Sequence, residues 1–244
     1  IAVQAIFEQA VAAFGDAPLN LSQVLHGGCD TGAALVADPR IALISATGST
    51  DMGRKVGQVA AARFAKTILE LGGNNAFLVL EDADIDKAVK TAITARMLNG
   101  GQSCIAAKRF ILVEGIYDEF VTKFTQALIK LKSGNPLDET TQVGPLARKD
   151  LADQLHRQIE ASVKLGAELL LGGHQQGCYH EPTILGSVQP GMPAFDEETF
   201  GPITVVVRVK SAQEAFTVAN DSAYGLSSGV FGRDVNRALA VAME

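Results

Sequence analysis

Short apolar segments alternate regularly with helix-forming segments along this chain. The apolar segment 41–45 leads through a glycine-containing loop at 48–53 into a helical pattern that runs to about residue 63, and the apolar segments 65–69 and 76–80 follow. Strands that alternate with helices predict an α/β fold with a largely parallel sheet. At 244 residues, the chain is long enough to bury a sizeable core and to hold one large domain or parts of two.

The rest of the chain continues this pattern. Apolar side chains at helical spacing predict further helices, and short apolar runs predict further strands. The predicted helices cover residues 1–14, 29–36, 85–98, 117–131, 147–165, 212–219 and 235–244. The predicted strands cover residues 21–25, 110–113, 167–171, 183–188 and 203–209. We expect Asp30 or Thr31 to cap the second of these helices and Asp84 to cap the third.

Composition and charge exclude several classes of function. The chain carries 21 Lys and Arg against 27 Asp and Glu, a net charge of -6, and it lacks a basic cluster interleaved with aromatic residues, so no nucleic-acid partner is expected. No apolar run has the length of a membrane span, so no membrane partner is expected. The three cysteines are odd in number and widely spaced, which predicts no disulfide framework and favours a reducing, cytoplasmic location.

Cys104 is the candidate nucleophile. It lies among small residues just after a helical pattern, with the carboxylate of Glu70 upstream, and a cysteine with a nearby base is the arrangement expected of an activated thiol. A lone intracellular cysteine is more often a small buried hydrophobe. Lys108 and Arg109 lie close in sequence, and a cation that faces the sulfur would favour the reactive thiolate. The sequence leaves open whether either cation does so.

The loop Gly48-Ser49-Thr50-Asp51-Met52-Gly53 is a candidate anion site. It follows an apolar strand and precedes a helix, where N-terminal amide groups bind phosphate. Its glycine spacing departs from the common dinucleotide fingerprint, so the spacing alone fits an ordinary strand-to-helix turn equally well.

Glu70 is the candidate general base. Its neighbours Leu69 and Leu71 predict an apolar setting that disfavours the charged carboxylate, as a base that works near neutral pH requires. The alternative is a partly buried glutamate held by a lysine or by backbone amides.

Two further groups of residues were weighed as sites. Glu198 and Phe200 precede Gly201 and Pro202, and their spacing alone indicates only a loop with an acidic edge. A second group lies close together in a glycine-rich stretch and consists of His174, Cys178 and His180. This group lacks a fourth ligand at suitable spacing, so we predict solvated loop residues and no metal site. Cys29 and Cys178 are predicted to be packing residues.

Four motifs stand in a fixed order along essentially the whole chain, and together they resemble the NAD(P)-dependent aldehyde dehydrogenase superfamily. They occupy residues 46–53, 70–73, 99–104 and 197–202 and match G-S-T-x-x-G, E-L-G-G, G-Q-x-C and E-E-x-F-G-P. Within that superfamily, residues 26–32 and 104–110 look most like bacterial succinate-semialdehyde dehydrogenases. The resemblance therefore implies an aldehyde substrate, with succinate semialdehyde the first choice, and NAD or NADP as cofactor.

The resemblance also implies roles for single residues. Cys104 would attack the aldehyde to form a thiohemiacetal and, after hydride transfer to the cofactor, a thioester, and its N–H would hold the oxyanion. Glu70 would activate the water that hydrolyses the thioester. The cofactor contacts are implied to be Gly48, Ser49 and Gly53 at the phosphates, Leu71 at the nicotinamide carboxamide, Glu198 at the nicotinamide ribose and Phe200 beside the nicotinamide.

The same resemblance implies a division of the chain. Residues 1–72 would be the C-terminal part of a partial Rossmann-like NAD(P)-binding domain, and residues 73–244 an α/β catalytic domain truncated at its C-terminus. The chain would be an internal fragment of a parent protein that forms a homo-oligomer, either a dimer or a tetramer. The second oxyanion contact, an Asn, and the positions that separate NAD from NADP would lie outside it.

Two alternatives stay open at this point. One is a CoA-acylating or phosphorylating reductase on the same scaffold, in which CoA or phosphate resolves the thioester, although Glu70 argues against it because a hydrolytic base is then unnecessary. The other is a catalytically incompetent fragment that keeps the fold for binding or assembly. The joint presence of Cys104, Glu70 and Glu198 argues against that second alternative for the parent protein.

Overall fold

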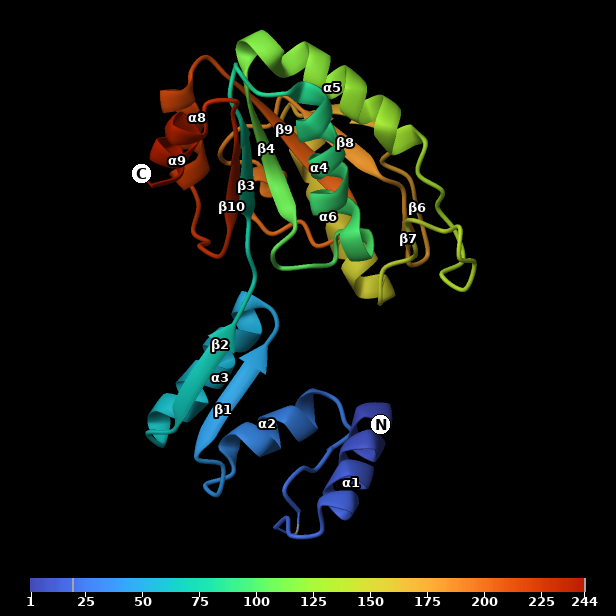
Figure 1. The fold of residues 1–244 in the computed structure, drawn as a ribbon, viewed down its shortest axis with the longest axis vertical. Coiled ribbons are helices and arrows are strands. Elements are labelled where there is room, and N and C mark those ends of the chain that lie inside the picture. The colour runs from blue at the N-terminus through green and yellow to red at the C-terminus, as the bar shows by residue number, and fades with distance from the viewer. Residues whose placement is uncertain (19, 244) are drawn as a thin grey trace. The chain divides into compact units, whose positions relative to one another are not determined.

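The computed structural model describes residues 1–18 and 20–243, which divide into two compact units, Ile1–Leu71 and Gly72–Glu244 (Figure 1). The α/β class predicted from the sequence is confirmed in both. Among the described residues, no helix combines the length and the apolar character that crossing a bilayer demands.

The first unit contains one strand–helix–strand crossover. Its elements are α1 (Ala2–Phe14), α2 (Cys29–Ala37), β1 (Leu43–Thr47), α3 (Thr50–Ala62) and β2 (Lys66–Glu70). The strands β1 and β2 pair in parallel, from Leu43 opposite Lys66 to Thr47 opposite Glu70. Because parallel neighbours need a crossover, α3 returns the chain across the pair and packs its apolar face on the strands. Ile44, Val56 and Ala60 form this small core.

The second unit is built on a six-stranded sheet with the strand order β10-β3-β4-β9-β8-β5. The strands are β3 (Asn75–Val79), β4 (Ala107–Val113), β5 (Glu168–Leu171), β8 (Thr183–Gly186), β9 (Ile203–Val209) and β10 (Ser228–Phe231). All neighbours are parallel except β5, which pairs antiparallel with β8. The central strands are covered on both faces, which explains why they read as nearly continuous apolar runs. A short antiparallel pair, β6 (Gln175–Gln176) and β7 (Tyr179–His180), stands apart from this sheet.

Helices cover both faces of the second unit's sheet (Figure 1). One face is packed by α4 (Ile85–Met97) and α5 (Glu114–Ile129) around an aromatic cluster that includes Phe110 and Phe120. The opposite face is packed by α6 (Lys149–Lys164), α7 (Pro193–Asp196) and α8 (Ala212–Asn220) around Phe195. The short η1 (Leu98–Gly101) follows α4, and α9 (Val235–Met243) lies beside β10.

Three predictions about elements are wrong in detail. Residues 21–25 form no strand and their apolar side chains are exposed, because a short apolar run becomes a strand only where another strand pairs with it. The N-cap of α2 is Gly28, without a side-chain cap, so neither Asp30 nor Thr31 has that role. β1 begins two residues later than expected.

The cap of α4 by Asp84 is confirmed, with Lys87 N donating to Oδ1 at 3.1 Å. Residue 244 of the last predicted helix lies outside the described residues.

Candidate active site

The turn before Cys104 is made by three consecutive residues in the left-handed region. These are Asn99 (φ 55°), Gly100 (φ 63°) and Gly101 (φ 76°). Asn99 Nδ2 donates to the carbonyl of Gln102 at 3.0 Å, and Gln102 Nε2 donates back to the carbonyl of Asn99 at 3.1 Å. The pair of bonds closes the end of α4 and directs the chain into Cys104.

Two contacts anchor this turn to distant parts of the second unit. A Cβ atom at Gly101 would overlap the carbonyl of Gly201, so the two backbones touch there. Gln102 Oε1 accepts a hydrogen bond from Ala147 N at 2.8 Å, just before α6. The turn therefore requires the glycine and the glutamine of the G-Q-x-C motif for structural reasons, whether or not they also contact a ligand.

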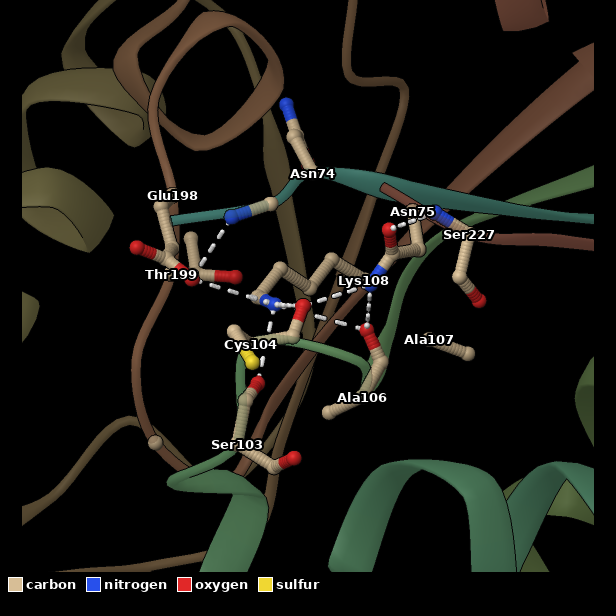
Figure 2. A network of polar contacts seen from close by, with 12 residues as sticks. Asn74, Asn75, Ser103, Cys104, Ala106, Ala107, Lys108, Glu198, Thr199 and Ser227 are labelled. Carbon is tan, nitrogen blue, oxygen red and sulfur yellow. Dashed lines mark hydrogen bonds and ion pairs between the residues drawn. The ribbon is translucent and has the colours of Figure 1, made fainter. Parts of the chain in front are cut away.

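Cys104 is partly buried, and Lys108 lies inside the loop that carries it. Lys108 Nζ donates to the carbonyls of Ser103 and Cys104, at 3.0 Å each, while Asn75 Nδ2 donates to the Cys104 carbonyl at 2.7 Å (Figure 2). Arg109 turns elsewhere and donates to carbonyls at the C-terminal end of α8. Of the two cations, Lys108 therefore binds the loop that carries Cys104, and Arg109 does not.

Glu198 joins the same network from the segment after α7. Its Oε1 atom lies 3.3 Å from Lys108 Nζ and accepts a hydrogen bond from Gly73 N at 3.1 Å (Figure 2). A side chain at position 72 would meet this carboxylate, so Gly72 permits the close approach. Glu198 and Cys104, two of the predicted site residues, are therefore brought together around one ammonium group.

Lys108 is almost fully buried, with a side chain only 1% exposed. Burial, together with the charge of Arg96, lowers its pKa to about 8, while Glu198 and Cys104 act in the opposite direction. Because the cation loses its hydration on burial, the contacts with carbonyl and carboxylate oxygens must replace the lost water.

Arg96 supports the segment that carries Phe200. Its guanidinium is fully buried in α4 and donates to the carbonyls of Ala107 at 3.0 Å and Thr199 at 2.8 Å, and also to the carbonyl of Gly201. Burial lowers the pKa of Arg96 to about 9, which leaves it charged at neutral pH. Phe200 follows Thr199 and precedes Gly201, two of the three residues whose carbonyls accept from Arg96, and its side chain is partly buried.

Sequence reasoning missed Arg96 and Asn75 and left Lys108 open. A signal existed for two of them, because Arg96 falls at helical spacing with Val89 and Ala92 on the buried face of α4, and Lys108 interrupts an apolar strand. A charged residue at a core position is usually paired or hydrogen-bonded, so these two positions could have predicted an ordered polar network.

The first unit groups the other predicted site residues at the carboxyl ends of its two strands. Gly48 N donates to the carbonyl of Glu70 at 3.0 Å, which places the glycine loop beside Glu70. Ser49 is the N-cap of α3, and its Oγ accepts from Met52 N at 3.2 Å. Gly53 is buried against the side chain of Leu71.

The apolar setting expected for Glu70 is not found within the first unit. Side chains alternate along a strand, so Leu69 and Leu71 project away from the face that carries Glu70, and the Glu70 side chain is exposed there. Neighbours in sequence were therefore a poor guide to the environment of this carboxylate.

His180 and Cys29 also differ from expectation. His180 is fully buried on β7, its Nδ1 lies 2.9 Å from the carbonyl of Glu181, and burial lowers its pKa, so it is not a solvated loop residue. Cys29 is exposed and not a packing residue. Within residues 1–18 and 20–243, no group of three or more His, Cys, Asp or Glu side chains is placed to hold a metal ion.

Comparisons with known proteins identify the family of the chain. The sequence model of the aldehyde dehydrogenase family matches residues 1–244. The chain is 46% identical over 211 residues to a succinate semialdehyde dehydrogenase of Escherichia coli whose name includes NAD(P)+, a match that covers 85% of this chain and 46% of that protein. It is 44% identical over 211 residues to a salicylaldehyde dehydrogenase of Pseudomonas putida, covering 86% of this chain and 44% of that protein.

Solved structures give the same result at the level of the fold. A salicylaldehyde dehydrogenase from Pseudomonas putida G7, complexed with salicylaldehyde, superimposes with a TM-score of 0.93 at 40% identity. The superposition covers 99% of this chain and 51% of that one. The chain thus has the aldehyde dehydrogenase fold and spans about half the length of the curated relatives it matches.

Proposed function

The chain belongs to the aldehyde dehydrogenase family, and on that premise we propose that it carries the reaction centre of an NAD(P)-dependent enzyme that oxidises an aldehyde to the carboxylic acid. One observation carries this proposal beyond the family assignment. The backbone of Cys104 and the carboxylate of Glu198 are held around the same buried ammonium group, so a nucleophile and a cofactor-binding group are ordered together.

Cys104 is the nucleophile in this proposal. Its sulfur adds to the aldehyde carbon to form a thiohemiacetal, and loss of hydride leaves a thioester on the same sulfur. The N–H of Cys104 donates to the oxygen on which negative charge develops. Glu70, whose side chain is exposed on β2, accepts a proton from the water that hydrolyses the thioester.

The residues present fit a dinucleotide cofactor. Gly48 and Ser49 are exposed at the N-terminus of α3, where backbone amides favour phosphate, and the Ser49 hydroxyl proton is available to a phosphate oxygen. The carboxylate of Glu198 is an acceptor suited to the two hydroxyl donors of a ribose. Leu71 and Phe200 complete the proposed contacts. Bound NAD or NADP would supply the hydride acceptor.

Succinate semialdehyde is the proposed substrate, because the relative at 46% identity carries that name. Salicylaldehyde is the second candidate, since a relative at 44% identity and a solved neighbour at a TM-score of 0.93 both bear the name salicylaldehyde dehydrogenase. Assembly into a homo-oligomer, either a dimer or a tetramer, and a cytoplasmic location are further parts of the proposal.

The proposal is tested by following cofactor reduction with each aldehyde, separately with NAD+ and NADP+, and with CoA or phosphate added or left out. We expect reduced cofactor and free acid without CoA or phosphate, and faster turnover of succinate semialdehyde. Reduction that requires CoA or phosphate would favour the acylating alternative. No reduction with either aldehyde and either cofactor would count against the proposed activity.

Replacing Glu198 with glutamine should weaken cofactor binding. The uncharged amide keeps the shape and one acceptor, but a hydrogen bond to a charged group contributes about 1.5 to 3 kcal/mol, so we expect the Kd for NAD(P) to rise about 10-fold to 100-fold. Calorimetric titration measures this change. The matched control is Glu197→Gln, which removes the neighbouring carboxylate and should leave the Kd nearly unchanged. Equal effects of the two substitutions would argue against a ribose contact by Glu198.

A further inference from the structure

Lys108 occupies an irregular position in β4. Asn75 of β3 pairs with Ala107, and the next residue, Ala76, pairs with Arg109, so Lys108 is left without a partner on β3. An extra residue of this kind bends a strand and re-aims its side chain, and such bulges are frequent next to active sites. In this structure the shift sends the Lys108 side chain into the loop that precedes its own strand (Figure 2).

The ammonium of Lys108 is surrounded by oxygen atoms. Its Nζ lies 3.0 Å from the carbonyl oxygens of Ser103 and Cys104, 3.4 Å from that of Ala106 and 3.3 Å from Oε1 of Glu198. Carbonyl dipoles that converge on one point repel each other unless a cation lies between them. The loop conformation around Cys104 therefore depends on the positive charge, and not only on the apolar stem of the lysine.

The contact at Ser103, whose carbonyl also accepts from Ala106 N at 3.2 Å, helps to fix the direction of an important donor. The carbonyl of Ser103 and the N–H of Cys104 belong to one peptide group, and that group is trans because none of the described peptide bonds is cis. In a trans peptide the C=O and N–H point in opposite directions. Since Lys108 holds the Ser103 carbonyl, the N–H of Cys104 points away from the ammonium and stays available to a substrate oxygen.

A second polar side chain helps but cannot replace the charge. Asn75 Nδ2 donates to the carbonyls of Cys104 at 2.7 Å and Ala106 at 3.1 Å, and Asn75 Oδ1 accepts from Ser227 N at 3.0 Å. Asn75 therefore ties the loop to the start of β10. The Asn75 side chain makes no hydrogen bond to Ser103, whose carbonyl is the one that sets the Cys104 N–H, nor to Glu198.

We propose that Lys108 is a positioning residue whose buried ammonium locks the Cys104 loop and the Glu198 carboxylate into one arrangement, with the N–H of Cys104 aimed at the substrate oxygen. The proposal rests on the proposed function, because it assigns Cys104 and Glu198 their catalytic and cofactor-binding roles. Lys108 itself touches neither substrate nor cofactor in this account.

The arrangement should depend on pH. The titratable groups that face Lys108 are Arg96 from α4, Glu198 from the segment after α7, and Cys104 from the loop before β4. Burial and Arg96 lower the pKa of Lys108 to about 8, so the ammonium is present at neutral pH and is lost as the pH rises through that value. Above it, the neutral amine no longer holds the converging carbonyls or the carboxylate.

The test compares the chain with its Lys108→Met variant, which keeps the apolar stem and removes the charge. The readout is the ratio of iodoacetamide labelling rates at Cys104 and at exposed Cys29 of the same molecule, determined by mass spectrometry from pH 6 to pH 10. We expect the ratio in the unchanged chain to fall as the pH passes about 8. In Lys108→Met it should be about tenfold lower at pH 7 and independent of pH, because no titrating ammonium holds the loop that carries Cys104.

Controls separate positioning from loss of structure. Lys123→Met removes a lysine that pairs with Asp86 and Glu119 on the surface, and it should leave the ratio unchanged. If Lys108→Met does not fold, Lys108→Gln, which keeps hydrogen-bond donors without the charge, takes its place with the same expected loss. A folded variant with the labelling ratio, the pH profile and the hydrogen exchange of the unchanged chain would overturn the proposal.

Hydrogen–deuterium exchange over residues 102–107 distinguishes this inference from the proposed function. Removal of the ammonium should speed exchange in that segment by about tenfold, whether or not Cys104 is a nucleophile. If Cys104 of the unchanged chain labels no faster than Cys29 while exchange still responds to Lys108→Met, the nucleophile assignment fails and the positioning role stands. If neither labelling nor exchange responds, the positioning role is wrong.

Discussion

Replacing Cys104 with alanine should lower kcat/KM for the proposed aldehyde oxidation by about 10⁴-fold or more, because in the proposed mechanism the sulfur forms the covalent bond on which every later step depends. The measurement is the rate of NAD(P)H formation at subsaturating aldehyde. Alanine is smaller than cysteine, so it introduces no steric clash, and at a partly exposed position it leaves no large cavity. The fold should therefore persist, and the Kd for the cofactor should change little.

The matched control for this variant is Cys178→Ala. Cys178 is also partly buried and lies in the same unit, but its backbone carbonyl accepts from Leu146 N, a bond that the substitution does not remove. Its activity should stay within about twofold of the unchanged protein, since surface and loop substitutions away from a site have small effects. A Cys104→Ala protein that keeps a substantial fraction of its activity would rule out a covalent intermediate at this position.

Replacing Gly101 with alanine should destabilise the second unit by about 2 to 4 kcal/mol. The left-handed φ of 76° costs an ordinary residue about 1 to 2 kcal/mol, and the added Cβ would overlap the carbonyl of Gly201, which forces the two segments apart. Urea unfolding followed by tyrosine fluorescence measures this loss. The three tyrosines, Tyr117, Tyr179 and Tyr224, all lie in the second unit and the chain has no tryptophan, so the signal reports that unit alone.

Gly100→Ala is the control for backbone strain. Gly100 has a similar φ of 63°, but the nearest atom to an added Cβ, Gln102 Nε2, lies 3.6 Å away, so only the conformational cost of about 1 to 2 kcal/mol remains. The difference between the two variants isolates the contact with Gly201. If Gly100→Ala and Gly101→Ala lose equal stability, that contact does not hold the turn in place.

Much of the fold was predictable because its signals are local. The span of β9, Ile203–Val209, agrees in full with the predicted strand, and α3 and α4 begin where Ser49 and Asp84 supply caps. The segment 21–25 shows the limit of such signals, because a strand exists only through a partner that the local pattern does not name. The four-residue α7 and the two-residue strands β6 and β7 were too short to leave a periodic pattern.

The candidate site divides in the same way. The motif residues Cys104 and Glu198 could be named from their order along the chain, but the ammonium that joins them could not, because the atoms around Lys108 come from residues up to 90 positions away. Three of its four neighbouring oxygens are main-chain carbonyls, which carry no sequence signal. For Glu70 the local sequence was misleading. Its leucine neighbours suggested a buried carboxylate, but side chains alternate along a strand, so these leucines lie on the other face and Glu70 is exposed.

The nucleophile role proposed for Cys104 is tested by mass-spectrometric mapping of iodoacetamide labelling on the three cysteines, with and without NAD(P) and aldehyde. Exposure alone would make Cys29 the fastest, because it is exposed while Cys104 and Cys178 are partly buried. If Cys104 is an activated nucleophile, it should label several-fold faster than both, and ligand should change its rate alone. Labelling that follows exposure, with Cys29 fastest and no response at Cys104 to ligand, would contradict the account.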